Sequence, residues 1–125
     1  MQIVTTRYGG FCFGVKRAVE TAMALEGEGN YVLGEIIHNE SVVEALKAHG
    51  VKTVSSVEEV PDGARLLIRT HGEAKVVFER AAEKKLEIVD CTCPFVRNIQ
   101  KIAEEKHGQG YAVIIAGDKN HPEVK

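Results

Sequence analysis

The sequence has few aromatic residues and almost no net charge. Its 125 residues contain no tryptophan, three tyrosines and four phenylalanines, which are too few to stack the bases of a single-stranded nucleic acid. Sixteen basic side chains are balanced by eighteen acidic ones, giving a net charge of −2. The chain therefore lacks the excess of positive charge that is typical of proteins that bind nucleic acids.

Long apolar runs are also missing. No stretch approaches the roughly 18 apolar residues that a membrane-crossing helix needs. Residues 1–7 (MQIVTTR) lack the basic and then apolar pattern of a secretory signal. We therefore expect no membrane partner and a cytoplasmic protein. With 44% hydrophobic and 27% charged residues, the composition is that of a folded domain rather than of a disordered chain.

Cysteine is scarce and its count is odd. The three cysteines, Cys12, Cys91 and Cys93, cannot all pair within one chain, and a reducing compartment would keep them as thiols. No Cys-x-x-Cys pair announces a common zinc module. The glycines at positions 9, 10 and 14 have the wrong spacing for a dinucleotide-binding fingerprint.

Short β-rich runs alternate with longer segments of helical periodicity. The expected strands are residues 3–6, 31–33, 51–54 (at an edge), 65–70, 86–90 and 111–116. The expected helices are residues 15–25, a segment capped by Asn39, residues 75–85, and a segment that starts at Pro94 and buries Phe95, Ile99, Ile102 and Ala103. This alternation predicts an α/β fold. We expect a three-layer sandwich with a mainly parallel sheet of four to five strands, formed by residues 1–125 as a single lobe.

The reactive side chains follow the expected strands. In a parallel sheet the loops after the strands gather at one edge, where ligands bind. The residues in these loops are Cys12, His38, His71, Cys91, Cys93 and His121. His49 and His107 instead lie where helices end, so we expect them at the opposite edge with structural roles.

The residues at this edge suit two kinds of ligand. Cys12 and Cys93 each precede an expected helix, whose positive dipole end favours the thiolate. Thiolates bind zinc or iron–sulfur clusters, whereas imidazoles together with helix N-termini suit an anion such as phosphate. A stand-alone zinc- or phosphate-binding module is therefore one alternative, with zinc held by Cys12, Cys91, Cys93 and one histidine.

Five short stretches share their order and approximate spacing with one enzyme family. They are Gly10–Val15 with Arg17 and Ala18, Glu35–Asn39, Thr70–Gly72, Asp90–Pro94 and His121–Val124. With them the chain resembles the amino-terminal part of the 4-hydroxy-3-methylbut-2-enyl diphosphate reductases. The resemblance implies an iron–sulfur oxidoreductase of the non-mevalonate isoprenoid pathway, which yields isopentenyl and dimethylallyl diphosphates.

The resemblance also implies a cofactor and an electron donor. The family enzyme is a three-lobed α/β protein with one [4Fe–4S] cluster, and its electrons come from reduced ferredoxin or flavodoxin. Cys12 and Cys93 would be cluster ligands, while the third ligand cysteine is missing from this chain. We therefore expect one lobe, truncated at its C-terminus relative to the family and inactive alone. Cys91 is an addition to the family pattern, and we expect it to be a buried thiol.

The remaining motif residues receive substrate roles from the same resemblance. His38, His71 and His121 would bind the diphosphate or the hydroxyl end of the substrate. Glu123 and His121 would act in catalysis, with Glu123 serving the proton supply.

Overall fold

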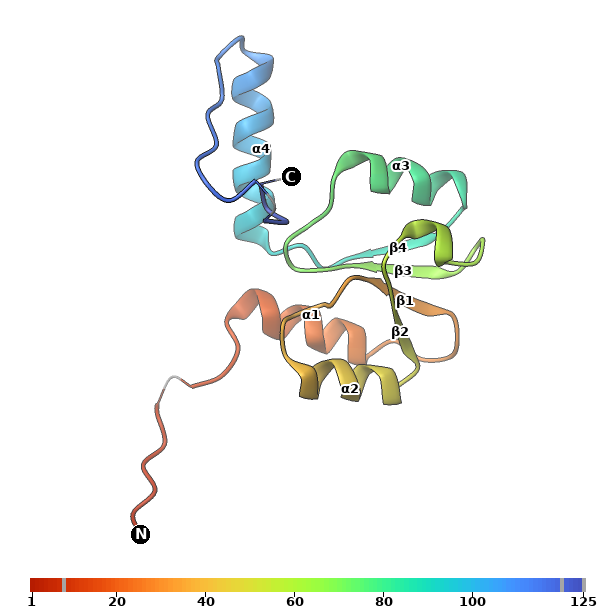
Figure 1. Ribbon diagram of the computed structural model, residues 1–125, viewed down its shortest axis with the longest axis vertical. Helices are drawn as coiled ribbons and strands as arrows, with labels where there is room; N and C mark the ends of the chain where they lie inside the picture. Colours follow the sequence, from red (N-terminus) through yellow and green to blue (C-terminus); the bar gives the residue numbers. More distant parts are fainter. Residues whose placement is uncertain (8, 120, 125) are drawn as a thin grey trace.

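The computed structural model describes residues 1–7, 9–119 and 121–124, and strands alternate with helices along most of this length (Figure 1). The elements are α1 (Phe13–Met23), β1 (Asn30–Leu33), α2 (Glu40–Ala48), β2 (Val51–Val54), the 3₁₀ helix η1 (Val57–Glu59), β3 (Arg65–Ile68), α3 (Lys75–Glu83), β4 (Glu87–Asp90) and α4 (Pro94–Gly108). No helix in the described part of the chain is long and apolar enough to span a membrane.

The four strands form one parallel sheet in the order β2-β1-β3-β4. Tyr31 of β1 lies opposite Lys52 on one side and Leu66 on the other. The chain therefore leaves β1 toward one edge and returns to pair β3 on the opposite side of β1. The carboxyl ends of β1 and β3 mark this reversal of strand order, which is where open α/β sheets bind their ligands.

Helices cover both faces of the sheet (Figure 1). Val32 and Leu67 pack with buried residues of α1 and α2, whereas Leu33 and Leu66 pack with residues of α3 and η1. Neighbouring residues of a strand point to opposite faces, so each strand contributes to both apolar layers. The expected α/β class, three layers and parallel sheet are confirmed.

Local signals set the boundaries of two helices as predicted. The side chain of Asn39 accepts a hydrogen bond from the backbone N–H of Val42 at 3.2 Å and caps α2. Pro94 is the first residue of α4, where the missing N–H costs no helical hydrogen bond.

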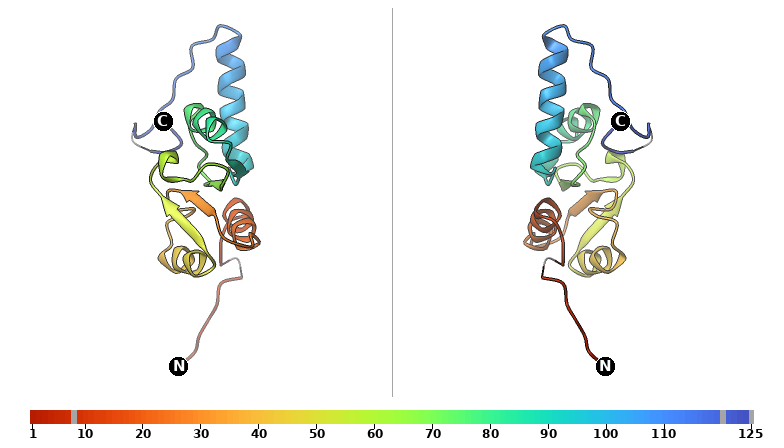
Figure 2. Two further views of the ribbon diagram at one scale, coloured as in Figure 1. Left: turned by 90° about the vertical axis from the view of Figure 1, so that its right-hand side faces the viewer. Right: turned by 90° about the vertical axis from the view of Figure 1, so that its left-hand side faces the viewer.

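The strands expected at residues 3–6 and 111–116 are wrong. Neither segment is a strand in the structure, and Ile114 is 90% exposed. A strand needs a neighbour for its backbone N–H and C=O groups, but residues 1–7 extend away from the sheet and residues 111–116 run back along α4 (Figures 1 and 2).

The buried face expected for α4 is also wrong. Phe95 is 72% exposed, Ile99 and Ile102 are exposed too, and Ala103 is half-buried. The helix projects beyond the sheet (Figure 2), so its apolar side chains find no layer to pack against. A hollow of about 680 Å³ lies between α4 and residues 111–116.

Candidate functional site

Three histidines and a glutamate come together beyond the carboxyl end of β3. The ring centre of His71 lies 6.1 Å from that of His38 and 5.7 Å from that of His121. The Glu123 Oε1 atom is 2.7 Å from His71 Nδ1, and the Glu123 backbone N–H donates to His121 Nδ1 at 3.2 Å. We call these four residues the imidazole cluster, and His71 is its centre.

The hydrogen-bond partners of each imidazole ring determine which ring nitrogen is free to contact a ligand. His71 and His38 both use Nδ1 toward a carboxylate, Glu123 for His71 and Glu35 at 3.2 Å for His38. When Nδ1–H donates to such a carboxylate, Nε2 stays available to a ligand. His38 is exposed and His71 is partly buried, so a ligand could reach the cluster from the His38 side.

The two expected cluster ligands lie at helix starts. Cys12 is the N-cap of α1 and Cys93 is the N-cap of α4, and neither side chain caps its helix. Gly14 lies against Cys93, because a Cβ atom at position 14 would be 2.7 Å from Cys93 Sγ. The missing side chain leaves room beside the Cys93 sulfur, and both thiols lie at positive helix ends. Each of the two thiols is thus of the chemical kind that holds an iron–sulfur cluster.

Hydrogen bonds hold the loop of Cys93 in place. The Cys93 N–H donates to the carbonyl of Thr70 at 2.9 Å, and Thr70 directly precedes His71. The guanidinium of Arg17 donates to the carbonyl of Thr92 at 2.7 Å, and the Thr92 N–H donates to Asp90 at 2.8 Å. The loops after β3 and β4 are therefore tied to each other and to α1, which couples the position of the Cys93 thiol to the imidazole cluster.

Cys91 is a buried thiol, as expected. It is 2% exposed and packs in the apolar layer under α1 and α2. Burial raises the pKa of the Cys91 thiol, Arg17 counteracts this in part, and Asp90 adds to it. The part of the chain that the structure describes contains no group of three or more His, Cys, Asp or Glu residues placed to hold a metal ion. The four-ligand zinc site considered from the sequence is therefore not assembled.

The two remaining histidines lie elsewhere. His49 is the C-cap of α2, next to the start of β2 and so at the amino edge of the sheet, as predicted. His107 lies in the last turn of α4, which carries it past the sheet (Figure 1) rather than to its opposite edge.

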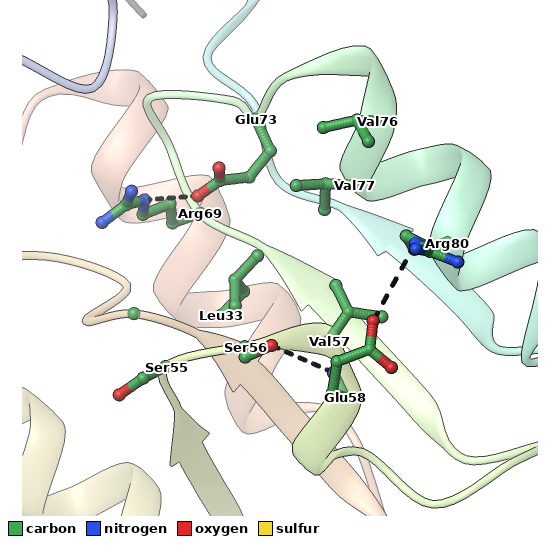
Figure 3. Close-up of a pocket in the computed structure, with 11 residues that line it drawn as sticks. Leu33, Ser55, Ser56, Val57, Glu58, Arg69, Glu73, Val76, Val77 and Arg80 are labelled. Carbon is green, nitrogen blue, oxygen red and sulfur yellow. Dashed lines mark hydrogen bonds and ion pairs between the residues drawn. The ribbon is translucent and has the colours of Figure 1, made fainter.

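Sequence reasoning missed an ion pair next to the imidazole cluster. A hollow of about 510 Å³ opens at the carboxyl ends of β1, β2 and β3 (Figure 3). Arg69 and Glu73 form part of its lining, and Arg69 Nε lies 2.9 Å from Glu73 Oε1. The signal in the sequence was an arginine and a glutamate four residues apart, flanking the Thr70–Gly72 motif.

Comparison with known proteins gives consistent matches. A family model described as LytB protein matches residues 3–125. The chain is 46% identical over 130 residues to a 4-hydroxy-3-methylbut-2-enyl diphosphate reductase of Thermoanaerobacter sp. (strain X514), covering 99% of this chain and 45% of that protein. A protein of the same name from Campylobacter hominis is 45% identical over 126 residues, covering 100% of this chain and 45% of its own length.

Solved structures agree with the sequence matches. The E-1-hydroxy-2-methyl-but-2-enyl-4-diphosphate reductase of Plasmodium falciparum superimposes with a TM-score of 0.89 and 36% identity, covering 94% of this chain and 38% of that one. An (E)-4-hydroxy-3-methyl-but-2-enyl diphosphate reductase has a TM-score of 0.84 and 40% identity, and the match covers 98% of this chain and 44% of that one. The chain thus spans less than half the length of these relatives.

Proposed function

Because this chain belongs to the LytB protein family, we propose that it forms the substrate-binding lobe of a 4-hydroxy-3-methylbut-2-enyl diphosphate reductase. One observation carries the proposal. The rings of His38 and His121, which come from separate parts of the chain, both lie beside the ring of His71, whose Nδ1 faces Glu123. The residue before His71, Thr70, accepts a hydrogen bond from the N–H of Cys93. The groups proposed to bind the anion and the iron therefore lie at the same edge of the sheet.

The imidazole cluster would bind the diphosphate or the hydroxyl end of the substrate. Imidazole N–H groups donate strong hydrogen bonds to phosphate oxygens, more so when the ring is charged. In His38 and His71, Nδ1 already faces a carboxylate, which leaves Nε2 for the substrate. The carboxylates thus orient both rings before the ligand arrives.

Glu123 would supply a proton to the departing hydroxyl group. Its carboxyl group contacts His71, so a proton can pass between Glu123 and His71. Its backbone N–H donates to His121 Nδ1 and so orients the His121 ring. The proposed reaction adds two electrons and two protons to the substrate. The C–O bond breaks, water leaves, and isopentenyl and dimethylallyl diphosphates are formed.

Cys12 and Cys93 would hold two corners of a [4Fe–4S] cluster, which when bound would pass electrons from ferredoxin or flavodoxin to the substrate. Gly14 keeps the space beside the Cys93 sulfur open. The helix starts at both cysteines favour the thiolate forms that bind iron. The third cysteine ligand would come from the part of the relatives that this chain does not span.

The exposed apolar side chains of α4 and residues 111–116 suggest how the lobe is completed. Phe95, Ile99 and Ile114 are all exposed, and apolar surface of this kind marks an interaction site. We propose that residues 1–125 are one lobe and that the rest of a longer enzyme packs against this surface. A cytoplasmic location belongs to the same proposal, since a reducing compartment preserves the free thiols.

A chimaera tests the function. Residues 1–125 replace the matching part of the Thermoanaerobacter reductase, to which they are 46% identical. The chimaera should convert 4-hydroxy-3-methylbut-2-enyl diphosphate to the two products when supplied with a chemical reductant. His71→Ala should lower kcat/KM by at least about 100-fold, in the range that positioned acid–base groups contribute, whereas His49→Ala should have no effect.

Iron content provides an independent reading of the same chimaera. Cys12→Ser and Cys93→Ser should lower the iron bound after anaerobic reconstitution, whereas Cys91→Ser should retain it. A folded chimaera with full iron content but no turnover would contradict the assigned substrate role. Unchanged iron in Cys12→Ser and Cys93→Ser would contradict the ligand assignment.

A further inference from the structure

An ion pair flanks the central histidine of the imidazole cluster. Arg69 lies two residues before His71 and Glu73 two residues after it, and Arg69 Nε is 2.9 Å from Glu73 Oε1 (Figure 3). The two side chains are only 21% and 15% exposed. Because the pair closes across Thr70, His71 and Gly72, it fixes the two ends of the turn that presents the His71 ring.

The arginine also contacts the turn that leads to His38. A Cβ atom at Gly34 would lie 2.7 Å from Arg69 Nη1, and Gly34 has a φ of +68°. Glycine is therefore required there twice, for the left-handed backbone and for the close guanidinium. Gly34 directly precedes Glu35, the carboxylate partner of His38. One guanidinium thus touches the starts of both turns that carry cluster histidines.

One buried atom of each side chain depends on the pair itself. Arg69 Nε and Glu73 Oε1 are buried and have no aligned hydrogen-bond partner among the described residues, so each relies on the opposite charge beside it. Removing one partner leaves the other charge unpaired and largely shielded from water, and moving the segment toward water relieves this. The segments in question are the two histidine turns.

We propose that Arg69, Glu73 and Gly34 form a positioning clamp that holds His38 and His71 at the spacing that diphosphate binding requires. The inference rests on the proposed function for its ligand, but the clamp itself is a property of the unliganded chain. Arg69 and Glu73 act through the histidines and are positioning residues, not catalytic ones. Their loss should separate the rings before it unfolds the sheet.

The test uses the 125-residue chain and three variants. Arg69→Met keeps the apolar stem and removes the charge, and Arg69→Lys keeps a charge that can pair with Glu73. Arg80→Met is the matched control, because Arg80 lines the same hollow but pairs with Glu83 on the exposed surface of α3. Ring-to-ring NMR cross-peaks between His38 and His71 report the spacing, and calorimetry with inorganic pyrophosphate reports binding.

Arg69→Met should lose the cross-peaks and bind pyrophosphate about ten-fold more weakly, comparable to losing an orienting partner at a metal-bound histidine. Arg69→Lys should restore most of both signals, and Arg80→Met should match the wild type. If Arg69→Met does not fold, Glu73→Gln and Arg69→Lys are compared in its place.

The outcomes separate the clamp from the function. A variant that melts earlier but keeps the cross-peaks and the affinity would overturn the clamp, because the pair would then only stabilise the fold. A wild-type chain that shows the cross-peaks but binds no pyrophosphate would count against the proposed substrate role. In that case the cross-peaks of the Arg69 variants still decide whether the clamp exists.

Discussion

Residues 13–93 and residues 94–124 both carry amphipathic helices, but they use them differently. In the first region Ala18, Ala22 and Leu46 of α1 and α2 are buried against the sheet. In the second region no residue of α4 is buried. The helices share the same periodicity, and the difference is whether a sheet lies beneath them. Periodicity predicts which face of a helix is apolar, but not what covers that face.

The site draws on both regions. His38 and His71 stand on turns of the well-packed sheet, whereas His121 and Glu123 come from the region with the exposed helix. The contact between His71 and Glu123, at 2.7 Å, joins the two halves. The first region therefore supplies the well-packed half of the site, and the second adds a half that has less packing of its own.

The largest expected effect tests the packing contrast. Leu67→Ala removes a fully buried side chain and should lower the free energy of unfolding by about 2–5 kcal/mol, the usual cost of a large-to-small core substitution. Ile114→Ala is the matched control in the second region and should change it by less than about 0.5 kcal/mol. Urea unfolding measures the free energy of unfolding of both variants. Equal losses in the two would contradict the difference in packing between the two regions.

A substitution at the junction of the two regions should have an intermediate effect. Gly14→Ala brings a Cβ atom to 2.7 Å from Cys93 Sγ, so the start of α4 must shift at a cost of about 1–3 kcal/mol. Gly108→Ala, with nothing within 4 Å of the added atom, should instead stabilise α4 by up to about 1 kcal/mol. The two variants are compared by urea unfolding and by the alkylation rate of Cys93. An unchanged rate and stability in Gly14→Ala would show that the helix starts do not meet.

The smallest expected effect is a pH dependence of the free energy of unfolding, and it arises from Cys91 in the first region. Burial raises the pKa of Cys91 above its ordinary value of 9.0, so unfolding releases a proton once the pH exceeds that value. The contribution of Cys91 to the free energy of unfolding is fully present below pH 9.0. It is lost as the pH rises from there toward the raised pKa of the folded state. For one proton, the free energy of unfolding cannot fall by more than about 1.4 kcal/mol per pH unit.

Cys91→Ala should flatten this slope, and Cys12→Ser should leave it unchanged. In the folded chain Cys12 should react with iodoacetamide long before Cys91, because Cys12 is exposed. Equal alkylation rates for the two thiols would show that Cys91 is not part of the core.

Much of the first region could be predicted because local chemistry and packing agree there. Asn39 caps α2, and the apolar runs that found neighbours became strands. At the start of the second region, Pro94 opens α4 as predicted. The strand expected at residues 111–116 failed because this segment runs back along α4 and not beside an edge of the sheet (Figures 1 and 2). His121 nevertheless reaches the predicted edge, since the chain returns along α4 to place it beside His71.

Other parts of the site could not be read from sequence spacing. The contact between Glu123 and His71 joins residues far apart in the chain, and no local pattern encodes it. Arg69 and Glu73 resemble an ordinary surface pair at helical spacing, and only their burial separates them from one. Burial is a property of the assembled sheet, so it became visible only in the structure.

Binding of a diphosphate by the imidazole cluster can be observed at the histidine rings themselves. Inorganic pyrophosphate is titrated into the chain while the ring signals of all five histidines are followed by NMR. We expect the signals of His38, His71 and His121 to shift together with one affinity, while those of His49 and His107 stay unchanged. A chain in which no ring responds, or in which His49 and His107 respond as strongly as the cluster, would contradict it.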